Sequence, residues 1–199
     1  MTESEVYLIG RDPVPQSITM GEGESRSITL VALPGTSAHL SMEVDMVAPG
    51  ASLDLAGLYI CPEDEKLELD ILVRHSSGGC NSRQLFKGVV GGHASACFGG
   101  LIYVAHDAQR TKAYQENHNL LLSNTAVVDS RPQLEIYADD VECSHGATSG
   151  HLDESQLFYM RSRGIPEAEA RRLQLISFLA PVASRLPEDL MQKVYESIA

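Results

Sequence analysis

The segment from Asp139 to Thr148 carries the residue types of this chain best suited to chemistry. Within seven positions it holds three carboxylates, a thiol and an imidazole. Cys143 and His145 are two residues apart, so both side chains point to the same face if the segment is an extended strand. A thiolate beside a neutral imidazole forms half of a site for a soft metal. Iron or zinc usually takes about four ligands, so the others must come from elsewhere in the chain or from a partner.

Each of these residues also has a plain structural interpretation. His145 is either a metal or sulfur-site residue that faces a partner, or a histidine hydrogen-bonded at the end of the last strand. Cys143 is either a ligand, whose pKa would be lowered by His145 or by a metal, or a small buried thiol. Asp139 and Asp140 either perform acid–base work or, as turn propensity favours, cap backbone N–H groups in a turn.

Composition excludes several classes of function. The 199 residues carry 15 Lys and Arg against 27 Asp and Glu, a formal net charge of −12, which disfavours binding to nucleic acid or anionic lipid. No apolar run approaches the roughly 18 residues of a membrane span, and the acidic N-terminus lacks the basic start of a signal peptide. The four cysteines are widely spaced and form no CxxC pair. We therefore predict reduced thiols in a cytoplasmic protein.

Two periodicities divide the chain. Apolar residues alternate with polar ones in 40–46, 67–73 and 134–138, which predicts strands with one buried face. Turn residues separate the strands and no helical pattern intervenes, so the array is a sandwich, a barrel or a solenoid. After Gly150 the pattern becomes helical, and we predict a β domain over 1–150 and a helical subdomain over 151–199.

The helical segment carries clear boundary signals. Asp153 and Gln156 resemble a capping box, Gly164 ends the first helix, and Pro166 and Pro187 begin the next two. Inward-facing apolar residues are expected at Leu173, Ile176, Leu179 and Ala180 in the second helix and at Leu190, Val194 and Ile198 in the third.

Several long ordered motifs resemble the SufB/SufD family, the scaffold subunits of the SUF iron–sulfur cluster assembly machine. The resemblance is close from about Phe86 to Ile176, is looser back toward Ser27, and is nearer to SufD than to SufB. The motifs are 139–150, 152–159 and 162–165, with Gln109, Tyr114, Gln115, 119–123 and 132–138 upstream.

The resemblance implies a mainly β fold, a right-handed parallel β-helix with a small α-helical tail at the C-terminus. Two strands per coil would give a repeat of about 27 residues. The tail is expected to cover one open end of the β-helix, where unpaired strand edges would otherwise be exposed. A long N-terminal helical region of the family is missing, so we expect a shortened homologue or a piece of a longer protein.

The resemblance also implies roles for individual residues. His145 falls where SufB and SufD both carry a histidine at their mutual interface, which is proposed to help hold the nascent cluster, and Cys143 matches a SufD cysteine. Asn117 and Gly146 stand where SufB carries a cysteine and a glutamate. We therefore expect this chain to lend residues to a shared site, with no stably bound cofactor and only transient iron or iron–sulfur cluster at a subunit interface.

The family pattern implies two partners and no enzymatic turnover. One is a SufB-like subunit, or a second copy of this chain, in a dimer. The other is a SufC-like ABC-type ATPase docked on the C-terminal helices, whose ATP-driven closure would rearrange the interface. The expected docking residues are Phe158, Tyr159, Ile165, Leu173 and Leu179.

Two other interpretations remain open at this point. One is a metal-independent β-solenoid module for protein–protein interaction, in which the motif is kept for its turn geometry. The other is a β-helix enzyme that acts on carbohydrate. Such enzymes line a groove with acids and aromatic residues, and this chain has no Trp and only four Phe.

Overall fold

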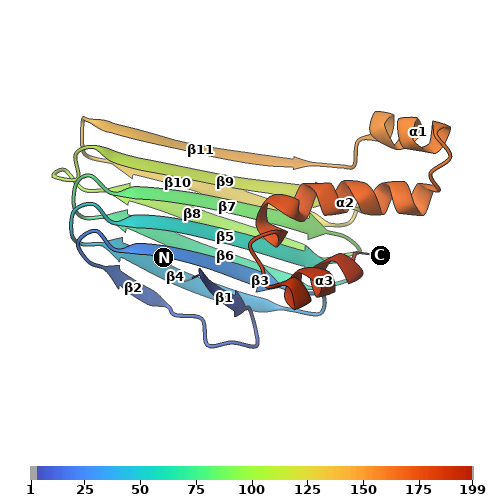
Figure 1. Ribbon diagram of the computed structural model, residues 1–199, viewed down its shortest axis with the longest axis horizontal. Coiled ribbons are helices and arrows are strands. Elements are labelled where there is room, and N and C mark those ends of the chain that lie inside the picture. Colours follow the sequence, from blue (N-terminus) through green and yellow to red (C-terminus); the bar gives the residue numbers. More distant parts are fainter. Residues whose placement is uncertain (1–3, 199) are drawn as a thin grey trace.

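The computed structural model describes residues 4–198 as two facing β-sheets followed by three helices (Figure 1). Sheet A contains β1 (Ser4–Leu8), β3 (Ser25–Ala32), β5 (Ser52–Cys61), β7 (Asn81–Val90), β9 (Thr111–Leu121) and β11 (Val141–Gly150). Sheet B contains β2 (Ser17–Met20), β4 (Ala38–Met46), β6 (Lys66–His75), β8 (Ser95–Val104) and β10 (Val127–Ile136).

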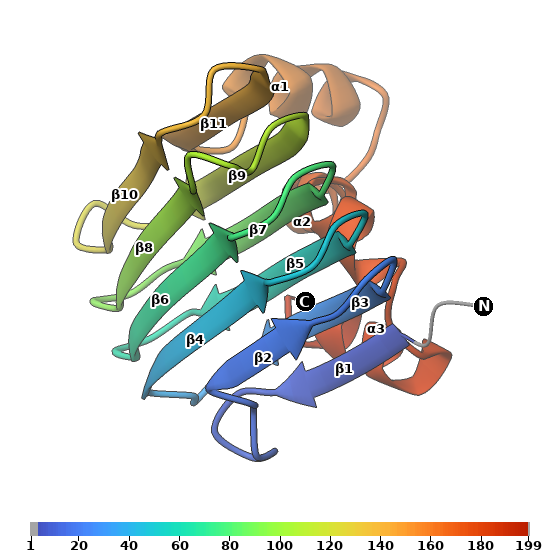
Figure 2. The same ribbon diagram turned by 90° about the vertical axis from the view of Figure 1, so that its left-hand side faces the viewer.

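The strands form a parallel β-helix, as the family resemblance implied. Successive strands alternate between the sheets, and every strand pairs in parallel with the strand one coil away (Figure 2). Paired residues lie 23 to 32 positions apart, from Ser4 with Ser27 to Ser95 with Val127. The predicted strands 40–46 and 67–73 are confirmed as β4 and β6. The strand predicted at 134–138 begins earlier, at Val127, and ends at Ile136.

Alternate residues of both sheets fill the space between them. Leu40, Met42, Val44 and Met46 of β4 are buried, as the period of two predicted. Aromatic residues fill the middle of the interior, where the rings of Phe86 and Phe98 lie 4.6 Å apart. A Cβ atom at Gly57 would overlap the Phe86 ring, so the absence of a side chain in β5 makes room for that ring.

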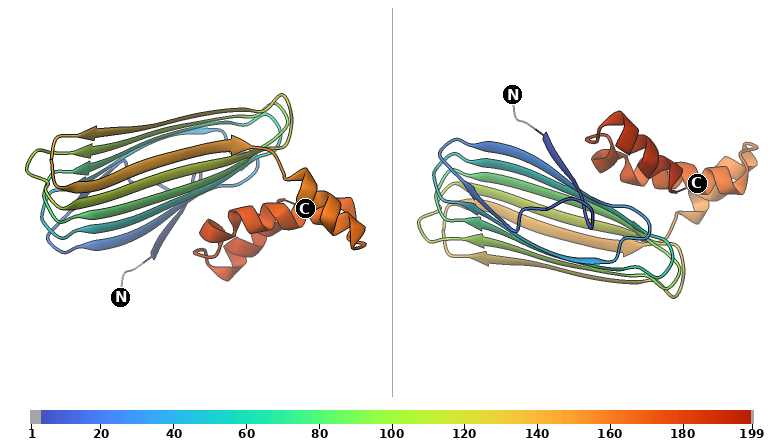
Figure 3. Two further views of the ribbon diagram at one scale, coloured as in Figure 1. Left: turned by 90° about the horizontal axis from the view of Figure 1, so that it is seen from above. Right: turned by 90° about the horizontal axis from the view of Figure 1, so that it is seen from below.

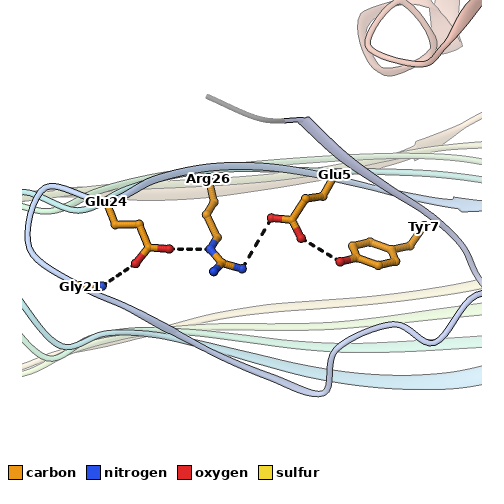
Figure 4. A network of polar contacts seen from close by, with 5 residues as sticks. All are labelled: Glu5, Tyr7, Gly21, Glu24 and Arg26. Carbon is orange, nitrogen blue, oxygen red and sulfur yellow. Dashed lines mark hydrogen bonds and ion pairs between the residues drawn. The ribbon is translucent and has the colours of Figure 1, made fainter. Parts of the chain in front are cut away.

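Polar side chains occupy the N-terminal end of the β-helix (Figure 4). Arg26 donates to Glu24 at 2.7 Å and lies 3.6 Å from Glu5, which accepts a hydrogen bond from the Tyr7 hydroxyl at 2.8 Å. The Gly21 N–H also donates to Glu24, and this contact and the Arg26 guanidinium hold the pKa of the carboxyl below its usual range. Charged groups in this position solvate the end of the apolar core.

The helices α1 (Glu154–Ser162), α2 (Glu167–Ala183) and α3 (Glu188–Glu196) follow β11. The Asp153 carboxylate caps α1 by accepting from the N–H groups of Ser155 and Gln156, and Gly164, with φ of +86°, follows the end of α1 as predicted. None of the helices within residues 4–198 is long and apolar enough to cross a membrane.

The helical tail packs on the outer face of sheet A (Figure 2). Leu175, Leu179 and Val182 of α2 share a buried cluster with Leu58 and Val89 of the sheet. The expectation that the tail covers an open end of the β-helix is therefore wrong, because the apolar side chains of the helices pack on the outward-facing apolar side chains of sheet A.

The packing also corrects the predicted stripe of α2. Leu179 is buried as expected, but Leu173 is 38% exposed and Ile176 is only partly buried. Leu175 and Val182 continue the buried stripe at helical spacing, and Leu186 is buried just past the end of α2. Leu190, Val194 and Ile198 are buried as predicted.

One buried histidine makes stability depend on pH. His75 is fully buried, with one ring nitrogen 2.8 Å from the Ser82 hydroxyl and its Nδ1 without a partner. Burial lowers the pKa of His75 to about 4. As the pH falls below about 6.5, the unfolded chain takes up a proton here that the folded chain does not, so acid favours unfolding until about pH 4.

We predict that His75→Gln removes part of the acid sensitivity of folding. Between pH 7 and pH 4 the wild type should lose up to about 3 kcal/mol more unfolding free energy than the variant. Urea unfolding at four pH values measures this difference. His106, whose side chain is 82% exposed, gives the control variant His106→Gln. Equal losses in wild type and His75→Gln would contradict the prediction.

Candidate functional site

The two candidate ligands lie on β11, the last strand of sheet A. The parallel register places Cys143 opposite Ala113 and His145 opposite Gln115 of β9. Ala113 and Gln115 are both buried between the sheets. Cys143 and His145 therefore share the inward-facing side of their strand, which is the geometry expected from their spacing.

The edge position of β11 leaves these residues accessible. No strand within residues 4–198 pairs with the far edge of β11 or of β10, and we call these two edges the open end (Figure 3). Cys143 is half-buried against a small apolar cluster that includes Ile102 and Val104, whereas His145 is exposed. The backbone groups along the open end are free to pair with another chain.

The Cys143 thiol is not activated in this structure. Burial raises the pKa of Cys143 above its ordinary value, and a hydrogen bond from the Ala113 backbone offsets this only in part. The expectation that His145 lowers this pKa is therefore wrong, because the only group within residues 4–198 that lowers the pKa of Cys143 is the Ala113 backbone. Of the two groups expected to lower the pKa of Cys143, only a metal ion remains, and its binding would deprotonate the thiol.

The interior becomes polar toward the open end. One column of inward-facing positions runs through Leu55, Gln84, Gln115 and His145. The Gln115 amide donates to Gln84 at 3.0 Å, but Gln84 Nε2 and Gln115 Oε1 have no partner although both residues are buried. Burying a polar atom without a hydrogen bond lowers the stability of the fold. These two amide atoms could therefore still accept a further hydrogen-bonding partner next to His145.

A second polar group surrounds Asn117. Asn117 donates to the Tyr59 hydroxyl at 3.1 Å and accepts from Asn119 at 2.8 Å and from Ser130 at 2.7 Å. Sequence reasoning missed this network. The available signal was the alternation of Gln115, Asn117 and Asn119, which a period of two would have placed inside.

The carboxylates of the motif do not gather around Cys143 and His145. Glu142 points to the opposite face, where it lies 2.8 Å from Lys112 and accepts from the Tyr114 hydroxyl at 3.1 Å. These two contacts hold the pKa of Glu142 below its usual range. Asp140 lies in the turn before β11, and its N–H donates to Gln109 at 2.9 Å. Gln109 and Tyr114 thus fix the turn and the first residues of β11.

The predicted docking residues fall into three groups. Phe158, Tyr159 and Leu173 are 73%, 59% and 38% exposed, Ile165 is half-buried, and Leu179 is fully buried between α2 and sheet A. The surface available to a partner is therefore narrower than expected. Beside it lies a cavity of about 420 Å³ between α1, α2, the end of β9 and the segment that joins β11 to α1. Its lining includes Leu120, Leu152, Met160, Leu173 and Phe178.

We predict that Cys143 reacts slowly with iodoacetamide at pH 7 and faster as the pH rises beyond the ordinary thiol range of about 8.5. The physical reason is the raised pKa of Cys143, which keeps the nucleophilic thiolate scarce at neutral pH. Mass spectrometry of the Cys143 peptide measures the rate at each pH, and Cys143→Ser is the blank. A rate that is already maximal at pH 7 would contradict this account.

Comparison with known proteins identifies the family of this chain. The family model for the SUF system FeS cluster assembly, SufBD core domain, matches residues 15–178. The iron–sulfur cluster assembly protein SufD of Escherichia coli is 43% identical over 167 residues, which cover 83% of this chain and 40% of that protein. A SufBD family protein of Mycobacterium leprae is 34% identical over 187 residues, covering 90% of this chain and 45% of that protein.

SufD of Bacillus subtilis is 42% identical over 114 residues, covering 57% of this chain and 26% of that protein. The chain thus spans less than half the length of these relatives. The matched region contains most of the β-helix, including β11, and continues into α2. The chain belongs to the SufBD core-domain family of the SUF iron–sulfur cluster assembly system.

Proposed function

We propose that this chain is a SufD-like scaffold subunit that lends Cys143 and His145 to an iron or iron–sulfur site shared with a SufB-like subunit or with a second copy of itself. One observation carries the proposal. The thiol and the imidazole occupy the same side of an edge strand whose far edge has no partner within residues 4–198.

The site on this chain is incomplete by itself. Among residues 4–198, the only cluster of three or more His, Cys, Asp or Glu side chains close enough to share a metal lies elsewhere, at His39, Glu68 and Asp70. Cys143 and His145 supply two donors where iron usually takes about four. A partner chain at the open end is the economical source of the rest.

The open end has the character of an interface. Of its two strands, β10 exposes Val127 at 57% and Ile136 at 39%, and Tyr137, just past β10, is 57% exposed. Apolar side chains beside unpaired backbone groups favour the addition of strands from another chain. Such a partner would extend both sheets and enclose His145.

We further propose that a SufC-like ATPase docks on α1 and the exposed part of α2, through Phe158, Tyr159 and Leu173. α1 follows β11 after three residues, so a force on α1 reaches the strand that carries His145. The His151 ring, which lies 2.9 Å from the Leu121 carbonyl, and buried Leu152 anchor this connection to β9. The chain then acts in the cytoplasm without turnover of its own, and nucleotide hydrolysis in the partner rearranges the shared site.

The raised pKa of Cys143 favours a second candidate, the metal-independent interaction module, because a protonated half-buried thiol is a poor ligand. Iron titration of the assembled complex with and without Cys143 separates the two. Loss of about one bound iron per complex on Cys143→Ser supports the shared site. Unchanged iron binding supports the module.

We predict that His145→Ala leaves the fold and the complex with a SufB-like subunit from the same genome intact but lowers the iron retained by that complex several-fold. His145 is exposed, so its removal creates no cavity. Co-purification followed by iron analysis measures both quantities. His93, an exposed histidine in the turn after β7, provides the control His93→Ala. Full iron retention by His145→Ala would contradict the role of this residue.

We predict that the double variant Phe158→Ser, Tyr159→Ser weakens binding of a SufC-like ATPase from the same genome by about tenfold or more, because exposed aromatic anchors dominate such interfaces. Both side chains are mostly exposed, so stability should change little. Calorimetric titration measures the affinity. Val127→Ser, at the open end, is the matched apolar control and should bind normally. Equal affinity of all three proteins would place the ATPase elsewhere.

A further inference from the structure

The outer face of sheet B carries a cluster of metal-binding side chains that the proposed function does not use. His39 lies on β4, and Glu68 and Asp70 lie two residues apart on the neighbouring strand β6. One ligand atom from each residue lies within 4.8 Å of the other two. This cluster lies on the face opposite the interior, because its residues alternate with buried Leu40, Leu67 and Leu69.

The register of the sheet places the cluster on a rigid support. His39 pairs with Glu68 across the β4–β6 ladder, and Asp70 follows on the same face. The His39 Nε2 atom lies 2.9 Å from the Asp70 carboxylate. Side chains on paired strands inside a sheet hold their spacing better than side chains on loops, which favours a defined coordination geometry.

The next strand leaves space for the Asp70 carboxylate. Gly99 of β8 lies opposite Asp70, and a Cβ atom at this glycine would be 2.5 Å from an Asp70 oxygen. The missing side chain lets the carboxylate lie flat against the sheet. A groove of about 310 Å³ extends from Asp70 over Gly99 toward Arg131 and Gln133, so water or a small anion can reach the remaining coordination positions.

The charges around the cluster fit a divalent cation. The two carboxylates bring two negative charges, which outweigh the one positive charge of Arg131 beside Asp70, and Glu68 forms no ion pair within residues 4–198. Lys66, two residues before Glu68, likewise makes no ion pair with either carboxylate among the described residues. One nitrogen and two oxygen donors suit zinc, manganese or ferrous iron.

We propose that His39, Glu68 and Asp70 form a second metal site, separate from Cys143 and His145, that binds one divalent transition-metal ion on the outer face of sheet B. Cys97 lies opposite Glu68 on β8, but the Arg131 guanidinium donates to its sulfur at 2.7 Å, so the thiol is engaged and is not among the ligands. The site stands whether or not the shared cluster site at the open end exists.

The test is calorimetric titration of the whole chain with zinc. A background of Cys143→Ser and His145→Ala removes the other candidate site, so that failure of one proposal does not affect the other. One zinc ion should bind per chain, and His39→Ala, Glu68→Gln and Asp70→Asn should each weaken binding by about tenfold or more. All three side chains are exposed or half-buried, so the variants should remain folded.

His118→Ala is the matched control. His118 also lies on a strand with one ring nitrogen 3.0 Å from a carboxylate, that of Glu116, but among residues 4–198 no third ligand joins this pair. Its removal should leave zinc affinity unchanged. The proposal is overturned if the background protein binds zinc no better than about 1 mM, or if the three variants bind as tightly as their parent.

Discussion

Every functional feature of this protein depends on the hydrogen-bonded register between parallel strands one coil apart. Because of that register, residues that are about 30 positions apart in the sequence lie side by side in the sheet. Each column of paired side chains therefore stays on one face. It places His145 above Gln115, and it places His39 beside Glu68. A slip of one residue would send each set to the opposite face of its sheet. The apolar interior of β3 to β7 fixes the register, because any slip there would expose buried leucines.

The interior changes character along the β-helix. The first coils are filled with leucine, isoleucine and methionine, whereas two neighbouring coils near the open end carry buried polar side chains, Gln84 on β7 and Gln115, Asn117 and Asn119 on β9. Stability therefore comes mainly from the N-terminal coils and from the helices packed on sheet A. The buried polar side chains of β7 and β9 cost part of that stability, since Gln84 Nε2 and Gln115 Oε1 lack hydrogen-bond partners. The exposed His145 of β11 lies next to Gln115 of β9, so its ring can contact these polar groups as well as a partner.

The sequence alone predicted most of the fold. Alternating apolar residues located β4 and β6, and Asp153 and Gly164 marked the ends of α1. The choice of a β-helix over a sandwich or barrel came from the family motifs, because strand periodicity is the same in all three. The position of the tail was predicted incorrectly, since an amphipathic pattern shows which side of a helix is buried but not what covers it.

Prediction of the candidate site was less complete. The two-residue spacing of Cys143 and His145 correctly placed them on one face. The raised pKa of Cys143 was missed because it depends on apolar neighbours on β8 and β9, far away in the chain. The cluster at His39, Glu68 and Asp70 was missed for the same reason, because His39 lies about 30 residues before the two carboxylates and no short motif contains all three.

The central claim is that the edge of β11 is where a partner completes the site, and hydrogen exchange tests it most directly. In the isolated chain, the β11 amides not bonded to β9 should exchange rapidly, as expected of an unpaired edge. Addition of a SufB-like subunit from the same genome should slow these amides strongly and leave β3 and β5 unchanged. A stable complex in which β11 exchanges as fast as in the isolated chain would contradict the claim.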